Sequence, residues 1–293
     1  MVQIVKRTKI WFTISLSIIV LGMGFLCFRG LNFGIDFTGG TILNINMNKQ
    51  ISNEDKKQMD ELLVKYTKKY SLREVNNKKE FEIIIQSGAL EDAKINEVKT
   101  KIKTDFKLGD KYLLSEDNIK GSVGKELTKN AWMALFSAAI VMLIYIGIRF
   151  EIDFGVAAMV ALVHDILITI SVYAILGIKV NSPFIAAILT IVGYSINDTI
   201  VIFDRIRENK KKLGKIKVEE LVDISINQTM KRSIYTSLST LITIIALVIL
   251  VPSIREFTVP LIIGISVGTC SSIFIASPVW AIIKKLKIKK GKA

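Results

Sequence analysis

The sequence predicts an α-helical polytopic membrane protein with six transmembrane helices and one extracytoplasmic α+β domain of ferredoxin-like type between helices 1 and 2. Three observations support this prediction. The 293-residue chain holds six long apolar runs, and its excess of basic residues is confined to alternate ends of those runs. Between the first two runs lies a polar segment of about 100 residues, in which the spacing of apolar residues alternates between that of strands and that of helices.

The six apolar runs are each long enough for a bilayer span, which needs about 20 residues. The first run follows Lys6, Arg7 and Lys9 and superficially resembles a signal peptide, but its apolar stretch is 19 residues long and no small-residue cleavage site follows it. We therefore expect an uncleaved span. The expected transmembrane helices are 10–28, 130–148, 154–176, 183–203, 233–251 and 257–283.

The net charge of +14 is distributed in a way that predicts topology. Segment 31–129 carries 18 Lys/Arg and 16 Asp/Glu and is nearly neutral. The excess lies in the tail 1–9, in the loop 204–232 and in the basic tail 284–293. Because basic loops stay on the cytoplasmic side, these three segments and both termini are expected in the cytoplasm, next to anionic lipids. This placement argues against a nucleic-acid partner.

The segment 29–129 reads as the extracytoplasmic domain. Strands are expected at 41–47, 80–86 and 111–115, with a weak strand near 70–76. Apolar residues at helical spacing predict helices over 52–68, where Ser52 and Asp55 have the spacing of a capping box, and over 90–106. The resulting order, β-α-β-β-α-β, is that of the ferredoxin-like plan.

A glycine-rich stretch directly follows the first span. Gly34, Asp36, Gly39 and Gly40 lie within it, and so many glycines predict a structural turn with close backbone approach rather than regular structure.

The fourth span contains Asn197 and Asp198, which are hard to explain in lipid. A carboxylate inside a span costs about 2.5–3.5 kcal/mol on insertion scales, so Asp198 is a functional candidate by default. Arg232 opens the fifth span and is followed by Thr236 in a row of hydroxyl residues. A carboxylate, an arginine and hydroxyls in this order suit a proton or sodium relay. The alternative is a neutral Asp198 that only fixes helix packing through a neighbouring hydroxyl.

Three further polar residues in or near the spans are secondary candidates. Asp165, in the third span, could be satisfied structurally by Thr169 and the backbone. His164 is adjacent to Asp165, so the two side chains should point about 100° apart and form no dyad. We expect His164 to be a packed neutral histidine. Asp204, at the membrane edge, is expected to be a solvated interfacial charge.

Enzymatic chemistry finds no support in the sequence. There is no phosphate-binding loop and no nucleophile motif. Cys27 and Cys270 lie inside spans without metal-ligand spacing. We therefore expect no catalytic residues, no metal and no cofactor.

Several motifs together carry a family resemblance over nearly the whole chain. The chain resembles the SecF family, the smaller of the paired SecD and SecF membrane subunits in the resistance-nodulation-division superfamily. The motifs are Gly34-Ile35-Asp36-Phe37-Thr38-Gly39-Gly40-Thr41, Ser122-Val123-Gly124, Ile148-Arg149-Phe150-Glu151, His164-Asp165, Gly193-Tyr194-Ser195-Ile196-Asn197-Asp198-Thr199 with Glu208-Asn209, and Arg232-Ser233-Ile234-Tyr235-Thr236-Ser237.

The resemblance implies a subunit of the Sec preprotein translocase in the bacterial cytoplasmic membrane. Such a subunit pairs with SecD, works beside the SecYEG channel and other accessory membrane subunits, and uses the proton or sodium motive force to promote late steps of preprotein export. Asp198 and Arg232 would be its ion-relay residues. Two other functions stay open: half of a small-molecule or lipid transporter of the same superfamily, and a non-conducting membrane scaffold. The choice between H⁺ and Na⁺ also stays open.

Overall fold

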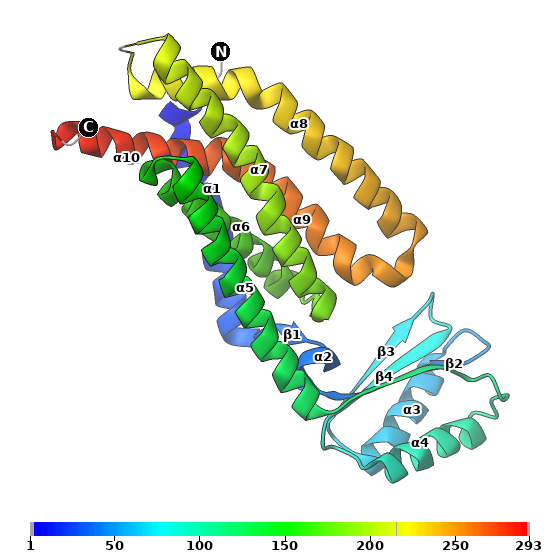
Figure 1. The fold of residues 1–293 in the computed structure, drawn as a ribbon. Helices are drawn as coiled ribbons and strands as arrows, with labels where there is room; N and C mark the ends of the chain where they lie inside the picture. The colour runs from blue at the N-terminus through cyan, green and yellow to red at the C-terminus, as the bar shows by residue number, and fades with distance from the viewer. Residues whose placement is uncertain (1–2, 215, 292–293) are drawn as a thin grey trace. The chain divides into compact units, whose positions relative to one another are not determined.

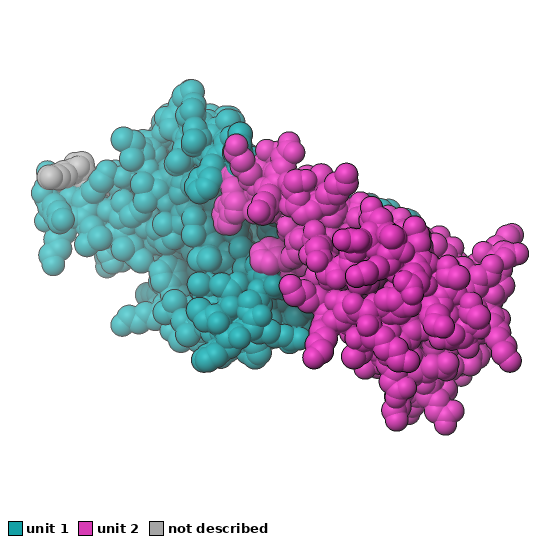
Figure 2. All heavy atoms as spheres, turned by 90° about the horizontal axis from the view of Figure 1, so that it is seen from below, with its two compact units in different colours: residues 1–32, 133–293 teal, residues 33–132 magenta. Residues whose placement is uncertain are grey.

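The computed structural model describes residues 3–214 and 216–291 and divides into two compact units. One unit is Phe33–Trp132, and the other joins Met1–Asn32 to Met133–Ala293. Figure 2 shows the two in different colours. The smaller unit is α+β and the larger one is built from long helices (Figure 1).

The smaller unit is a four-stranded antiparallel sheet with two helices on one face. Its strands lie in the order β3-β4-β2-β5, and strands and helices follow one another along the chain as strand, helix, strand, strand, helix, strand. Alternate residues of β2 and β4, such as Leu43 and Ile83, are fully buried against both helices. The elements are β2(Gly40–Asn46), α3(Asn53–Tyr66), β3(Tyr70–Val75), β4(Glu80–Gln86), α4(Asp92–Asp105) and β5(Leu113–Ile119).

Helix α3 begins where its sequence predicts. Ser52 is the N-cap of α3, and its hydroxyl accepts the backbone N–H of Asp55 at 3.1 Å. The Asp55 carboxylate in turn accepts the backbone N–H of Ser52 at 2.9 Å, which completes the capping box. The last strand differs more from its prediction: it runs to Ile119 rather than over 111–115.

The glycine-rich stretch makes the expected tight turn but also contains one helical turn, α2(Ile35–Thr38). Gly39 and Gly40 follow it with φ of 70° and 142°, values that residues with a side chain rarely adopt. A Cβ on Gly40 would lie 2.4 Å from the carbonyl oxygen of Ile85, because strand β4 passes directly against it. The expectation of no regular structure was therefore wrong for four residues.

Six helices are long and apolar enough to cross a membrane within the described residues. They occur in chain order close to the six predicted runs, and the last is interrupted by a π-helical turn before Pro278 (Figure 1). The helices are α1(Thr8–Arg29), preceded by the short η1(Val5–Arg7), then α5(Gly121–Arg149), α6(Ile152–Leu176), α7(Ser182–Lys212), α8(Val218–Leu250) and, after η2(Pro252–Ile254), α9(Arg255–Ser271), η3(Ser272–Ala276) and α10(Ser277–Lys289). The two-residue strands β1(Asn32–Phe33) and β6(Lys179–Val180) complete the list.

Helices replace much of the predicted loop between the fourth and fifth spans. Helix α7 continues to Lys212 and α8 begins at Val218, so most of the second half of the predicted loop 204–232 forms one continuous helix with the fifth span. The sequence prediction ended the helices at the bilayer edge, whereas charged residues extend them beyond the apolar stretch without any helix breaker. Helix α5 likewise begins at Gly121, nine residues before the predicted span 130–148.

Glycines allow the helices of the larger unit to pack closely. A Cβ on Gly22 of α1 would lie 2.5 Å from the Cα of Ser171 on α6. In the same way, a Cβ on Gly268 of α9 would lie 2.9 Å from the Cβ of Ser195 on α7. Small residues at helix contacts bring backbones together, and here they hold α1 on α6 and α9 on α7.

The basic C-terminal segment is mostly an ordered helix rather than a tail. Helix α10 runs to Lys289, and residues 292–293 of the predicted tail lie outside the described residues, as do residues 1–2 of the N-terminal tail and residue 215 of the loop. Lys287 donates to the buried carboxylate of Asp153 at 2.5 Å, and Lys285 pairs with Glu219. These pairs tie α10 to the starts of α6 and α8.

Candidate ion-relay site in the helical unit

Two carboxylates lie inside the bundle of the larger unit. Asp165 of α6 is 1% exposed and Asp198 of α7 is 3% exposed. Each is in the apolar part of a candidate span, where an uncompensated carboxylate is expensive. The surrounding helices supply hydroxyl groups to both, and the two sets of hydroxyls are different.

Asp198 lies in a network formed by α7, α8 and α9. Ser237 of α8 donates its hydroxyl to the Asp198 carboxylate at 3.2 Å, and Thr269 of α9 donates to the Ser237 oxygen at 2.6 Å. The Tyr194 hydroxyl, one turn earlier on α7, approaches Ser237 at 3.4 Å and Thr240 at 3.2 Å. Hydroxyls can both donate and accept, so this network can pass a proton or surround a small cation.

The other predicted relay residues lie outside this network. Arg232, Thr236 and Asn197 are exposed in the single chain. Within residues 3–214 and 216–291, no ion pair joins Asp198 to Arg232, and the Thr236 hydroxyl donates to the Arg232 carbonyl oxygen at 2.8 Å. The structure thus places these polar groups on the surface of α7 and α8, where a single chain leaves them uncovered.

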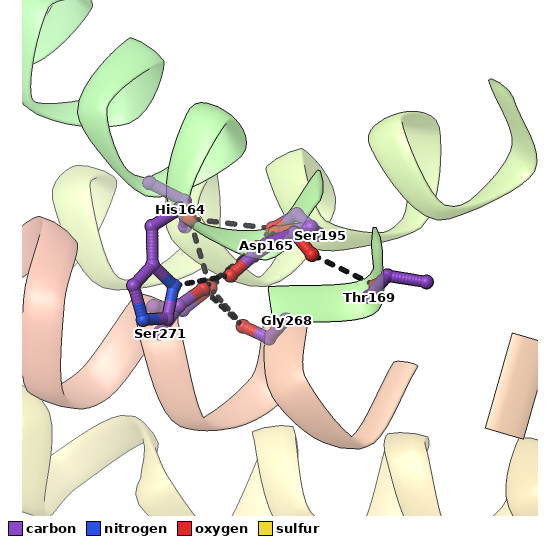
Figure 3. Close-up of polar contacts among 8 residues, drawn as sticks. His164, Asp165, Thr169, Ser195, Gly268 and Ser271 are labelled. Carbon is purple, nitrogen blue, oxygen red and sulfur yellow. Dashed lines mark hydrogen bonds and ion pairs between the residues drawn. The ribbon is translucent and has the colours of Figure 1, made fainter. Parts of the chain in front are cut away.

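Asp165 is held by serines from two other helices. One carboxylate oxygen accepts the hydroxyls of Ser195 on α7 at 2.5 Å and Ser271 on α9 at 2.8 Å (Figure 3). Thr169 was one group that could have satisfied this carboxylate, but its hydroxyl donates instead to the backbone carbonyl of Asp165 at 2.8 Å. A residue four positions along a helix reaches the backbone carbonyl more easily than the side chain.

His164 and Asp165 do contact each other, contrary to the prediction. The Nδ1 atom of His164 lies 2.9 Å from the second carboxylate oxygen of Asp165 (Figure 3). The prediction considered only the directions of the Cα–Cβ bonds. An imidazole and a carboxylate extend beyond Cβ, and their outer torsions let neighbouring side chains turn toward each other. His164 Nε2 is buried and has no hydrogen-bond partner among the described residues.

Asp204 lies in α7 just after the apolar stretch 183–203 and has the contacts expected for an interfacial charge. Its carboxylate accepts from Arg149 at 3.3 Å and from Arg207 at 3.0 Å, and all three side chains are more than one-third exposed. Such pairs contribute little free energy. This geometry gives Asp204 no link to the buried carboxylates.

Four site residues escaped the sequence analysis, namely Tyr194, Ser195, Thr269 and Ser271. The available signal was the small and polar spacing on the sixth span, where Gly264, Gly268, Ser271 and Ser272 recur at three- and four-residue intervals. Such a row predicts a tightly packed helix face. It does not say which neighbouring side chains its hydroxyls meet.

Comparison with known families identifies two matching regions. Residues 98–286 match the family model described as "Protein export membrane protein SecD/SecF, C-terminal". Residues 24–51, which contain Gly39 and Gly40, match the "SecD/SecF GG Motif".

Individual relatives match over almost the whole chain. The protein translocase subunit SecF of Sebaldella termitidis is 38% identical over 97% of this chain and 92% of its own length. The SecF subunit of Haemophilus influenzae is 34% identical over 94% of this chain and 83% of its own. The SecDF subunit of Thermus thermophilus is 37% identical over 90% of this chain, which spans 36% of that longer protein.

Solved structures of SecDF resemble the fold as well. The crystal structure of SecDF from Thermus thermophilus, a translocon-associated membrane protein, matches with a TM-score of 0.85 and 36% identity over 96% of this chain and 38% of that chain. SecDF in a super-membrane-facing form matches with a TM-score of 0.71 and 34% identity over 98% of this chain and 39% of that one. This chain belongs to the SecF family of protein translocase subunits.

Proposed function

We propose that this chain pairs with SecD and uses the proton or sodium motive force to promote late steps of protein export across the cytoplasmic membrane. The proposal rests on the environment of Asp198, whose carboxylate lies in an apolar helix and is 3% exposed. Ser237 donates a hydrogen bond to this carboxylate, and the hydroxyls of Thr269 and Tyr194 are hydrogen-bonded to Ser237 in turn. A scaffold needs no such group in the membrane, since an apolar side chain would pack there at lower cost.

SecD is the proposed partner because this chain offers only part of a relay. It spans 38% of the solved SecDF chain that it resembles, and Asn197, Arg232 and Thr236 are uncovered polar groups on its helices. Polar side chains do not face lipid readily, so a second membrane subunit would cover them. We assign Asp198 and Arg232 as ion-relay residues, with Asn197 and Thr236 as their neighbours.

The smaller unit is proposed to be an extracytoplasmic ferredoxin-like domain, within the segment 29–129. Its strand and helix order supports the fold, and the basic residues beside the spans support a cytoplasmic location for both termini. In that orientation the domain would meet the preprotein as it leaves the SecYEG channel. The basic ends of the helices would lie against anionic lipids.

The test is export of a preprotein in cells depleted of their own subunit and rescued with variants. We expect Asp198→Asn to reach normal membrane levels but to reduce the export rate about tenfold or more, because the amide keeps the hydrogen bond and cannot take up a proton. Gly193→Ala is the matched control on the same helix, since an added Cβ there meets nothing within 4 Å.

Full rescue by Asp198→Asn would reject ion coupling through this residue and leave the scaffold as the better explanation. Normal preprotein export together with altered efflux of small molecules would instead support the transporter alternative.

A further inference from the structure

The contacts of Asp165 raise a charge problem that the relay at Asp198 does not solve. Asp165 is 1% exposed in α6 and has three polar neighbours: Ser195, Ser271 and His164. The two serines are neutral donors. A carboxylate with only neutral partners would leave a net negative charge in the membrane interior, so the charge state depends on His164.

Charged groups on the packed helices do not neutralise Asp165 either. Helix α1 has no titratable residue between Lys9 and Cys27, and the π-helical turn Ser272–Ala276 has none. Within the apolar parts of the other helices packed against α6, the titratable groups are Asp198 and Tyr194 on α7 and Cys270 on α9. The remaining ones lie beyond the apolar stretches, at 204–212 of α7, at Arg255 and Glu256 of α9, and at the lysines of α10, of which Lys284 and Lys287 pair with Asp153 at the start of α6. None of these supplies a cation next to Asp165.

The geometry favours one place for a neutralising proton. One oxygen of Asp165 accepts the hydroxyl of Ser195 at 2.5 Å and that of Ser271 at 2.8 Å, and the Ser271 hydroxyl has the Gly268 carbonyl oxygen at 3.0 Å as its other acceptor. The other oxygen of Asp165 lies 2.9 Å from His164 Nδ1, a hydrogen-bond distance, so one hydrogen lies between these two atoms. This holds whether the pair is neutral or carries a charge of minus one. With the shorter contacts of both serines directed at the first oxygen, the extra proton is placed on Nε2, the second ring nitrogen of His164, which has no partner among the described residues.

We propose that His164 and Asp165 form a net-neutral pair that holds one proton in addition to the one they share, and that this pair is a second proton site of the subunit. Release of the Nε2 hydrogen to water leaves the ring with Nδ1–H and changes the net charge of the pair from zero to minus one. Ser195 lies one helical turn before Asp198 on α7, so this change acts directly on the helix that carries Asp198.

The role in an ion cycle rests on the proposed function, whereas the protonation state can be measured without it. His164 is the single histidine of the chain, so ¹⁵N-histidine labelling gives an unambiguous signal. We would label the full chain, place it in lipid bilayers and record the Nε2 resonance between about pH 6 and pH 8 by solid-state NMR. A histidine without a charged partner is largely neutral at about pH 8.

The expected result is a protonated Nε2 throughout this range in the wild-type chain and a neutral ring, with one of its two nitrogens bare, at about pH 8 in Asp165→Asn. Thr169→Val is the control, because Thr169 binds only the backbone carbonyl of Asp165, and it should reproduce the wild-type spectrum. A bare Nε2 in the wild-type chain at about pH 7 would overturn the proposal, even if Asp165→Asn fails to fold. So would a ring with both nitrogens protonated at about pH 8 in Asp165→Asn.

Neither overturning result would affect the export test, which depends on Asp198. The two proposals can therefore fail separately.

Discussion

At the scale of single residues, Asp165 and Asp198 illustrate different ways of placing a carboxylate in the apolar part of a span. Asp198 is bonded to a hydroxyl of α8 and lies near exposed polar groups. Asp165 is enclosed by serines of α7 and α9 and by its neighbour His164. The first environment suits exchange of an ion with a partner subunit, and the second suits retention of a proton.

Gly40 sets the start of the first strand of the smaller unit, and its replacement tests the glycine turn. Gly40→Ala should lower the free energy of unfolding of this unit by about 1–3 kcal/mol, because the backbone has φ of 142° and the new Cβ would meet the Ile85 carbonyl oxygen at 2.4 Å. Gly109→Ala is the control, since its Cβ would meet nothing within 4 Å. The measurement is a urea titration of the full chain followed through the methyl resonance of the buried Met59. Equal midpoints for the two variants would contradict the prediction.

Asp55 should make the smaller unit sensitive to acid. Burial raises the pKa of Asp55, but the hydrogen bonds from Lys49 and from the backbone and hydroxyl of Ser52 outweigh it, so the pKa lies below its ordinary 3.8. A pKa that is lower in the folded unit means that the stabilisation is present above about pH 4 and is lost as the pH falls through the folded value.

The same Met59 titration measures this effect. Between about pH 5 and pH 3 the wild-type unit should lose more stability than Asp55→Asn, whose amide does not titrate. Ser52→Ala should cost about 1 kcal/mol at neutral pH, the usual effect of losing an N-cap. Parallel pH curves for wild type and Asp55→Asn would show that the capping box does not control the acid response.

At the scale of helices, α7 connects the two carboxylates. Its Ser195 binds Asp165, its Asp198 binds Ser237, and its contact with α9 is tight enough that Gly268 is required opposite Ser195. A shift of α7 along α9 would therefore alter both networks together. Under the two proposals above, protonation at one aspartate would therefore affect the hydrogen bonds of the other through α7.

The contact of α1 with α6 offers a direct test of helix packing. Gly22→Val should lower the thermal unfolding temperature of the detergent-solubilised chain, because its side chain would meet the Cα of Ser171 at 2.5 Å; overpacking of this kind costs about 1–3 kcal/mol. Gly24→Val lies two residues away on the same helix, where an added Cβ meets nothing within 4 Å. The second variant should keep the wild-type temperature. If both variants melt together, α1 does not pack on α6 as described.

At the scale of the whole molecule, the proposed orientation can be tested with thiol labelling. In a chain with Cys27 and Cys270 replaced by alanine, a membrane-impermeant reagent should label Lys94→Cys, on the exposed face of α4, in intact cells. Leu213→Cys, in the short connection between α7 and α8, should be labelled only after the membrane is opened. The reverse pattern would invert the topology derived from the basic loops.

The sequence by itself determined the spans, the order of the elements in the smaller unit and the family. These follow from local patterns: apolar length, strand and helix periods, the Ser52–Asp55 cap and the glycine motif. The sequence analysis predicted helix ends poorly, as the continuous α8 shows. Apolar patterns indicate where a helix leaves the lipid, whereas the helix itself continues as far as its backbone hydrogen bonds do.

Only the tertiary structure decided which groups meet. Ser195 and Ser271 are 30 and 106 positions from Asp165, and nothing in their local sequence indicates that their hydroxyls share one carboxylate oxygen. The contact between His164 and Asp165 also depends on side-chain torsions that only the surrounding helices fix. Contacts between distant segments depend on how whole helices pack. The sequence pattern predicts which face of a helix is buried, but it does not predict which helix packs against that face.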